Sequence, residues 1–165
     1  MDHRKGVHHL GLATHDLDAT LEFYEKVLGF QTRVCEMIHP PGGGAIRHAF
    51  IDVGQNQMLA FMEPNSVRGV PEDFDPGINR GLGIPAGIIH FAFWCDDEAD
   101  LDARLQELRG RGLKVTDIVD HAWCKSIYFH DPNGIQLEYC CYIGELGPEH
   151  VAARHGSQWT GLSRG

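Results

Sequence analysis

An internal repeat of about eighty residues constrains this chain more than any other feature. Residues 9–13 and residues 90–94 both begin with a histidine and continue with a strand-like apolar pattern. An acidic residue, an amphipathic stretch and a glycine then follow in the same order in both copies. The repeat therefore predicts two similar modules, each with a strand that starts at a histidine and leads into a helix.

The rest of each module is predicted from its start and stop signals. Asp16 and Asp97 are suitable N-caps, and Gly29 can take the left-handed position after the first helix. Residues 131–134, Asp-Pro-Asn-Gly, are a strong turn signal between two strands. The predicted strands span residues 31–37, 46–53 and 57–63 in the first copy, and 113–119, 124–130 and 135–142 in the second. This is an α+β fold of two tandem βαβββ modules.

Proline and glycine mark the boundary between the modules. We predict a first module at residues 1–63, a linker at 64–88, a second module at 89–143 and a C-terminal tail at 144–165. The linker contains four prolines and several glycines. A connection of this length in a small domain is often functional, and we expect it to act as a lid over a site.

Composition excludes several classes of function. The formal net charge is −9 and no cluster of Lys and Arg occurs, which argues against a nucleic-acid partner. No apolar run approaches the roughly 20 residues of a membrane span, and the N-terminus shows no secretory signal. The five cysteines have no CxxC spacing, so we expect free thiols in a reducing, cytoplasmic environment.

Two histidines and one glutamate are the candidate metal ligands. His9 and His90 are equivalent in the repeat, and alternation places Glu138 beside Gln136 on one face of the last strand. A buried, unpaired carboxylate is costly, and a divalent metal would remove that cost. Two imidazoles and one carboxylate form the set used by non-haem Fe(II) oxygenases. The residues alone leave a second interpretation open, in which His9 and His90 are core histidines and Glu138 is an edge-strand glutamate. His8 should point to the opposite face from His9 and serve a structural role.

The repeat resembles the vicinal oxygen chelate superfamily over residues 7–142. This superfamily includes glyoxalase I, fosfomycin-resistance proteins and type I extradiol ring-cleavage dioxygenases. Each module there offers one ligand at the start of its first strand and another on its last strand; the matching positions here are His9, Ala60, His90 and Glu138. The resemblance implies a half-open mixed β-barrel around a divalent metal held by the three ligand-type residues. Ala60 argues against glyoxalase I activity, because that enzyme typically uses all four positions.

A longer motif favours the dioxygenases within that superfamily. Residues 121–138 resemble the dioxygenase motif, which runs from a His through a hydrophobic–Tyr pair and an acidic-Pro-x-Gly turn to the ligand Glu. The resemblance implies that His121 hydrogen-bonds bound oxygen or substrate and that Tyr128 hydrogen-bonds a substrate oxygen. His48, preceded by Arg47, matches the position of an acid–base histidine. Each of these residues also has a simpler interpretation. His48 would be a strand histidine that faces solvent, His121 a loop histidine and Tyr128 a core aromatic residue.

The leading hypothesis is an Fe(II)-dependent extradiol dioxygenase that acts on a catechol-type aromatic and O2. Full-size enzymes of that class usually have four modules, whereas this chain has two. Mn(II) or another divalent metal would accept the same ligands. The alternatives are a metal-dependent lyase, epimerase or fosfomycin-modifying enzyme, and a metal-free small-molecule binding protein. The resemblance also implies a homodimer or larger homo-oligomer, in which paired modules come either from one chain or from two.

Overall fold

The computed structural model describes residues 6–155 and contains two copies of one element order. The first copy comprises β1 (His9–Ala13), α1 (Leu17–Glu22) with a π-helical turn (Phe23–Val27), β2 (Gln31–Ile38), β3 (Ala45–Gly54) and β4 (Gln57–Asn65). The second comprises β5 (Phe91–Trp94), α3 (Glu98–Gly110), β6 (Val119–Asp120), β7 (Cys124–His130) and β8 (Gln136–Tyr142). A short helix α2 (Ile78–Gly81) lies in the segment between them, and a 3₁₀ helix (Pro148–His155) follows β8. The rest of the predicted tail lies outside the described residues.

Both main helices begin as their sequences predict. The Asp16 side chain accepts a hydrogen bond from the Ala19 amide at 2.9 Å, and the Asp97 side chain accepts one from the Asp100 amide at 2.9 Å. These caps satisfy amides that lack a partner in the first turn. Gly29, at φ +76°, reverses the chain after the first helix.

One predicted strand is much shorter than expected. Of the predicted strand 113–119, only Val119 forms a ladder, in the two-residue strand β6 (Val119–Asp120). The preceding stretch instead docks on β7 at a single point, because the Thr116 amide donates to the Tyr128 carbonyl at 3.1 Å and the Thr116 hydroxyl accepts from the Tyr128 amide at 3.1 Å. The other predicted strands are confirmed to within two residues.

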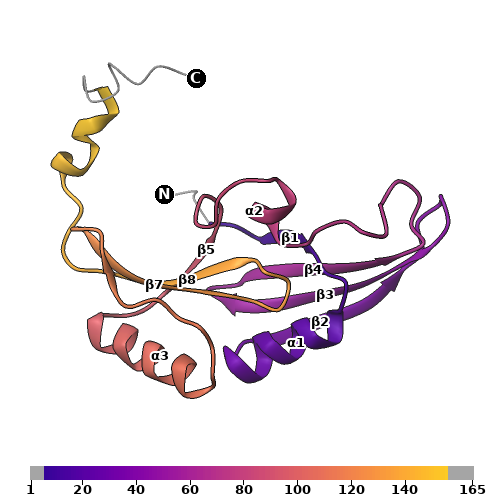
Figure 1. The fold of residues 1–165 in the computed structure, drawn as a ribbon, viewed down its shortest axis with the longest axis horizontal. Coiled ribbons are helices and arrows are strands. Elements are labelled where there is room, and N and C mark those ends of the chain that lie inside the picture. The colour runs from indigo at the N-terminus through magenta and orange to yellow at the C-terminus, as the bar shows by residue number, and fades with distance from the viewer. Residues whose placement is uncertain (1–5, 156–165) are drawn as a thin grey trace.

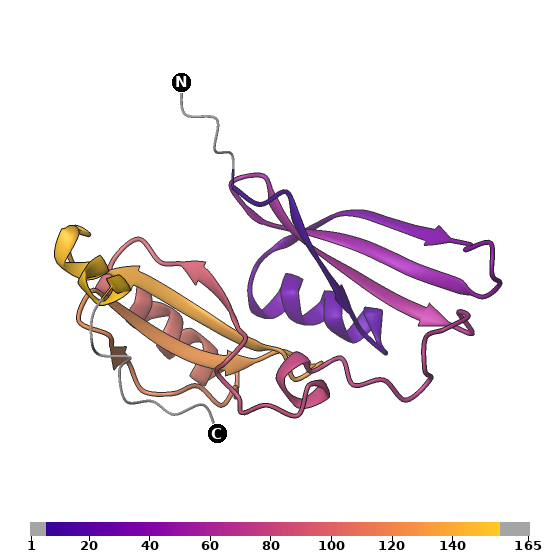
Figure 2. The same cartoon turned by 90° about the horizontal axis from the view of Figure 1, so that it is seen from above.

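The strands form two mixed sheets of four, with orders β1-β4-β3-β2 and β5-β8-β7-β6. In each sheet the outer pair β1–β4 or β5–β8 is parallel and the other pairs are antiparallel. The two sheets lie side by side, with α1 and α3 on the same side of both (Figures 1 and 2). We call the face of each sheet away from its helix the open face. Over residues 6–155 the sheets do not close into the half-open barrel that the resemblance implied.

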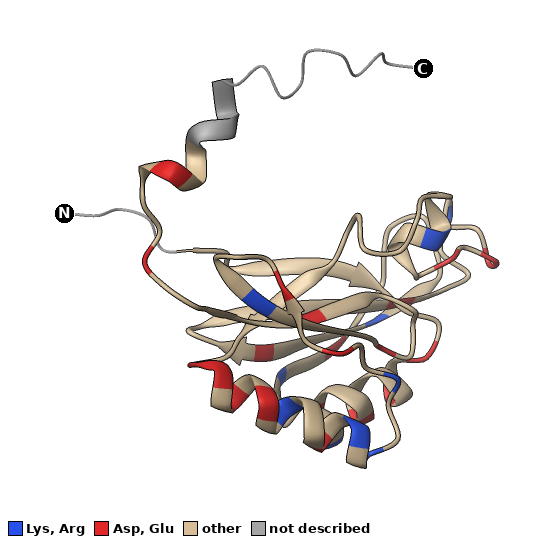
Figure 3. Ribbon diagram, turned by 60° about the vertical axis from the view of Figure 1, so that its left-hand side comes forward, with Lys and Arg blue, Asp and Glu red and all other residues tan. Residues whose placement is uncertain are grey.

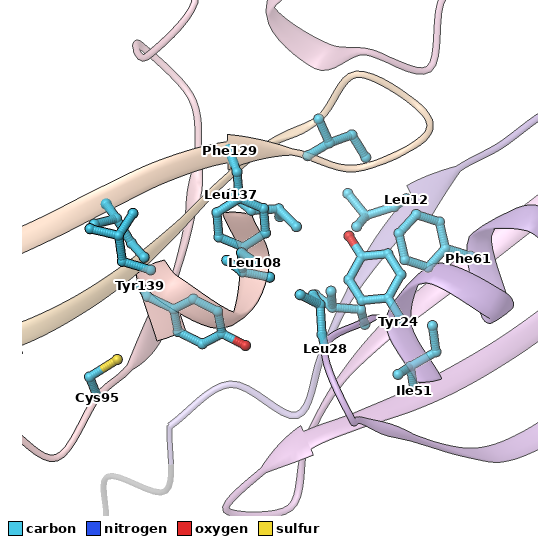
Figure 4. Close-up of a cluster of buried hydrophobic side chains, with 14 of the residues drawn as sticks. Leu12, Tyr24, Leu28, Ile51, Phe61, Cys95, Leu108, Phe129, Leu137 and Tyr139 are labelled. Atoms are coloured by element: carbon cyan, nitrogen blue, oxygen red, sulfur yellow. The ribbon is translucent and has the colours of Figure 1, made fainter. Parts of the chain in front are cut away.

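A single hydrophobic core joins the two modules. Tyr24, Leu28 and Phe61 of the first module belong to the same buried cluster as Phe129 and Leu137 of the second. Figure 4 shows these side chains converging between the two sheets and their helices. The ring centroids of Phe30 and Phe93 lie 5.0 Å apart across the junction. Burial of this apolar surface favours one fixed arrangement of the modules.

A buried polar network also spans the junction. Asp131 and Asn133 come from the turn between β7 and β8, and both reach into the first module. The Tyr24 hydroxyl donates to Asp131 Oδ2 at 3.2 Å, and the Thr14 hydroxyl donates to Asn133 Oδ1 at 2.7 Å. Asn133 Nδ2 donates to the Thr20 hydroxyl at 3.1 Å. Because buried polar groups are costly without partners, these hydrogen bonds across the junction favour one arrangement of the modules.

Surface features agree with the composition. Acidic and basic residues are interleaved along α3, and the strands above it are largely uncharged (Figure 3). Among the described residues, no helix has the length and apolar character needed to cross a membrane. All five cysteines are free thiols, as the sequence predicts.

Candidate functional site

Strand register makes the ligand positions of the two modules equivalent. Ala60 lies opposite Gly11, two residues after His9. Glu138 lies opposite Ala92, two residues after His90. The repeat therefore persists in space, and Ala60 occupies the place that Glu138 occupies in the second module.

His90 and Glu138 form a direct pair on the open face of the second sheet. His90 Nε2 lies 2.8 Å from Glu138 Oε2, and only 5 % of the Glu138 surface is exposed. His90 Nδ1 lies 2.9 Å from the Gly87 carbonyl oxygen, so Nδ1 must be the donor in that bond. Nε2 then faces a carboxylate oxygen of Glu138, an arrangement in which either a proton or a metal ion would bridge the two atoms.

A divalent metal fits this donor set. Ligands at about 2.0–2.2 Å from one ion, near a right angle, are separated by roughly 3 Å, close to the observed contact. A carbonyl oxygen on the second ring nitrogen is the usual way in which a protein orients a metal-binding histidine. His90 and Glu138 would hold such an ion, and further ligands are needed to complete its coordination.

A hydrogen-bonded pair of a histidine and a tyrosine lies next to these two residues. Tyr128 is the cross-strand neighbour of Glu138, and its ring lies 5.8 Å from that of His90. His121 Nε2 is 2.9 Å from the Tyr128 hydroxyl. Burial, together with the charge of Glu138, raises the pKa of Tyr128 above its usual range. The phenol therefore stays protonated near neutral pH and is able to donate a hydrogen bond on this face.

The open face of the first sheet carries a second, separate group. The ring centroid of Phe50 lies 5.4 Å from that of His9 and 4.4 Å from that of His48, so the three side chains are contiguous. His48 Nδ1 lies 3.2 Å from Glu36 Oε1, from the opposite position on β2. Arg47 turns to the helix side and pairs with Asp18. Thus His9 and His48 share the open face of the first sheet.

The two groups do not meet within one chain. Among residues 6–155, no three His, Cys, Asp or Glu side chains come close enough together to hold a metal. His90 with Glu138 lies on one sheet and His9 on the other, and the buried network of Asp131 and Asn133 fixes those sheets side by side. A chain in this arrangement therefore presents two partial sites that face outward.

A cavity of about 620 Å³ opens at the junction of the modules. Leu28 and Phe30 line it from the first module, and Phe93, Trp94 and Tyr139 line it from the second. None of the predicted ligands or acid–base residues contributes to its wall. The cavity is therefore separate from the predicted ligands and acid–base residues.

Sequence reasoning missed two polar contacts on the first module. Glu36 was not considered, because its position opposite His48 depends on the register of β2 against β3. The prediction that His8 points away from His9 is wrong, since the two Nδ1 atoms lie 2.8 Å apart. His8 immediately precedes β1, so strict alternation does not apply to it.

Comparison with known proteins agrees with this geometry. A family model, the Glyoxalase/Bleomycin resistance protein/Dioxygenase superfamily, matches residues 6–139. The chain therefore belongs to this superfamily. A curated relative from Arabidopsis thaliana, Glyoxylase I 4, is 24% identical over 142 residues, which is 84% of this chain and 71% of that protein.

Solved structures of similar fold include three from actinobacterial sources. A glyoxylase/bleomycin resistance protein/dioxygenase domain from Frankia sp. EAN1pec has a TM-score of 0.59 at 21% identity, covering 83% of this chain and 97% of that one. TnmS3, an antibiotic binding protein from Streptomyces sp. CB03234, has a TM-score of 0.56 at 19% identity, covering 81% and 93%. A glyoxalase/bleomycin resistance protein/dioxygenase from Nocardioides has a TM-score of 0.55 at 25% identity, covering 89% and 93%. These similarities establish the fold of two tandem modules.

Proposed function

We propose that this chain is a metal-dependent oxygenase of the superfamily, an extradiol ring-cleavage dioxygenase that uses Fe(II), O2 and a catechol-type aromatic. The observation that carries the proposal is the open face of the second sheet. There a His90–Glu138 pair suited to a divalent metal lies beside the hydrogen-bonded pair His121–Tyr128. An oxygenase needs both a metal site and nearby proton donors, and these adjacent strands supply both.

We further propose that the site is completed between two copies of the chain. Apolar side chains are exposed on both open faces, including Val34 (44%) on the first sheet and Trp94 (66%) on the second. Exposed apolar patches on a soluble protein commonly mark an interface. A second copy related by a two-fold axis would cover the second sheet of one subunit with the first sheet of the other. His9 of the partner subunit would then complete the set with His90 and Glu138.

The residues of this shared site have distinct roles. Fe(II), when bound, would accept the two oxygens of a catechol and offer a remaining position to O2. His48 of the partner subunit, held by its own Glu36, would accept a proton from a catechol hydroxyl. Tyr128 would donate a hydrogen bond to a substrate oxygen. His121 lies within hydrogen-bonding distance of Tyr128 and would supply or relay a proton near neutral pH.

A second candidate is a metal-dependent lyase, epimerase or fosfomycin-modifying enzyme, in which the same ligands stabilise an anionic oxygen. The curated relative named Glyoxylase I 4 favours an activity of this wider group. Ala60, buried at the fourth ligand position, opposes glyoxalase I itself. A third candidate is a metal-free binding protein, a function suggested by the antibiotic binding protein among the similar structures. His90 and Glu138 argue against it, because a sequestering pocket does not require ligands.

Oxygen consumption tests the leading proposal. Protein reconstituted anaerobically with Fe(II) is mixed with a panel of catechols, and O2 uptake and the absorbance of ring-opened product are recorded. Uptake with a coloured product is expected from the wild type and not from His9→Ala. One metal bound per chain with no uptake on any catechol would overturn the oxygenase and favour the lyase or transferase class. Wild-type protein that binds no metal would favour the binding protein.

Subunit mixing tests the shared site. His9→Ala and Glu138→Ala are each expected to be inactive, and each is purified separately, mixed, dissociated and reassociated. If ligands come from both subunits, random pairing should restore about a quarter of the wild-type sites, because half of the dimers then contain one intact site. If each site forms within one chain, mixing should restore no activity, and the shared site is excluded.

A further inference from the structure

The two histidines at the ligand positions have different partners on their second ring nitrogen. His90 Nδ1 donates to the Gly87 carbonyl, which leaves Nε2 as the atom that faces Glu138. Within residues 6–155, no backbone carbonyl is hydrogen-bonded to the His9 ring; its Nδ1 lies 2.8 Å from His8 Nδ1. Nδ1 therefore has a hydrogen-bond partner in both modules. For His90 the partner is a backbone carbonyl, and for His9 it is a side chain.

The position of His8 is fixed by the sheet. Its carbonyl accepts a hydrogen bond from the Met58 amide at 3.0 Å, which ties the residue before β1 to the start of β4. The rings of His8 and His9 meet edge to face, with centroids 5.0 Å apart. One of two facing Nδ1 atoms must carry the hydrogen. If His9 donates, its Nε2 keeps a free lone pair on the open face of the first sheet, where the ring lies beside Phe50.

We propose that His8 is a positioning residue that holds His9 in the tautomer with a hydrogen on Nδ1 and a free Nε2 for a divalent metal. In this role His8 accepts a hydrogen bond from His9 Nδ1, as the Gly87 carbonyl accepts one from His90 Nδ1. This role rests on the proposed metal site. A ligand whose tautomer is already set binds metal without first having to change tautomer or ring orientation, and loss of such a partner typically costs about 10- to 100-fold in metal affinity.

Two variants and a control test this role with Co(II) as the probe. The dissociation constant is measured on the full chain by titration of the visible absorption of bound Co(II). His8→Ala is expected to weaken binding by about 10- to 100-fold. His8→Asn should bind within a few-fold of wild type, because its side-chain oxygen accepts a hydrogen bond from Nδ1. His15→Ala is the matched control: His15 is also exposed, and its Nε2 contacts the Phe74 carbonyl at 2.6 Å rather than a candidate ligand.

A second measurement needs no metal. Long-range ¹H–¹⁵N correlation spectra distinguish the two neutral tautomers of each histidine. The hydrogen of His9 should lie on Nδ1 in the wild type and in His8→Asn, and should move largely to Nε2 in His8→Ala. Wild type that binds no Co(II) removes the metal site and this role with it. Wild type that binds Co(II), with His8→Ala binding equally well or the His9 tautomer unchanged, overturns the role of His8 alone.

Discussion

The open faces of the two modules have equivalent backbone positions but different side chains. Position for position, the first module has His9, Ala60 and Phe50, whereas the second has His90, Glu138 and Tyr128. Register proves the equivalence, because Phe50 lies opposite Ala60 just as Tyr128 lies opposite Glu138. Only the histidine is kept in both. The first face therefore offers one of the predicted ligands beside Phe50 and Ala60, and the second adds a predicted carboxylate ligand and a phenol.

In the proposed site, this inequality would let a symmetric fold hold an asymmetric set of ligands. Four ligands from two equal modules would surround an ion, whereas three from unequal modules would leave positions free for substrate and O2. Ala60 at the fourth position would then leave room for those molecules. Phe50 adds an apolar surface next to His9 and His48, of the kind that an aromatic ring would contact.

The largest expected effect comes from removal of the carboxylate that the first module lacks. Glu138→Gln keeps the shape of the side chain and removes its charge. Metal affinity should fall by more than roughly 100-fold, the upper end of the loss seen for residues that only orient a ligand. Isothermal titration with Mn(II) measures it. Glu63→Gln, which changes a carboxylate paired with Arg47 in the first module, is the control and should bind as wild type. Normal affinity in Glu138→Gln would exclude this residue as a ligand.

Addition of the missing carboxylate should make the modules more alike. Ala60→Glu places a fourth ligand at the position equivalent to Glu138. Metal affinity should rise by about tenfold, as it does when carboxylates are added to other metal sites, while O2 uptake should fall because an open position is filled. Ala60→Gln has a similar volume without the charge and should not gain affinity. Equal affinities for both variants would show that Ala60 does not face the metal.

The sequence predicts the modules better than their assembly. Caps, turns and alternation locate the helices and most strands, because these features depend on neighbours a few residues apart. The strand prediction is wrong for residues 113–118, because they dock on β7 through Thr116 instead of forming a ladder. The arrangement of the sheets is also not readable from periodicity. Asp131 and Asn133 look like turn residues, and only the structure shows that they also bind the other module.

That junction provides a test of the fixed arrangement. Asp131 Oδ2 accepts from Tyr24 and from Asn133 Nδ2, and its Oδ1 accepts from the amides of Asn133 and Ile135. All four partners are donors, so Asp131→Asn brings an NH2 group against donors and should lower the free energy of unfolding by about 1–3 kcal/mol. Urea unfolding measures it, with the exposed Asp102→Asn as control. Equal stability of the two variants would show that the network does not hold the modules together.

The Asp131 carboxylate should also make the free energy of unfolding depend on pH. Burial raises the pKa of Asp131, although hydrogen bonds from Asn133 and the Ile135 amide oppose that shift. The folded state therefore binds a proton on the Asp131 carboxylate more tightly than the unfolded state does. As a result, the contribution of Asp131 to the free energy of unfolding falls as pH rises from the usual pKa of 3.8 through the raised value. The difference in stability between wild type and Asp131→Asn should consequently narrow across this range. A difference that widens with pH would contradict the raised pKa.

The smallest expected effect has the opposite sign and lies on the first module. A hydrogen bond from Arg47 lowers the pKa of Asp18 below its usual 3.8. The contribution of this pair is fully present above that pH and is lost as pH falls through the lowered pKa. Because Asp18 is fully exposed, solvent and salt screen the pair and the loss should be small. Urea unfolding of Asp18→Asn at about pH 6 and about pH 3 should show a larger deficit at the higher pH, and added salt should reduce it.

Asp102→Asn, at an exposed position of α3 in the second module, is the control. It changes a carboxylate outside the described ion pairs and should show no such pH-dependent deficit. An equal deficit in both variants would mean that charge in general, rather than the Arg47 pair, stabilises the first module.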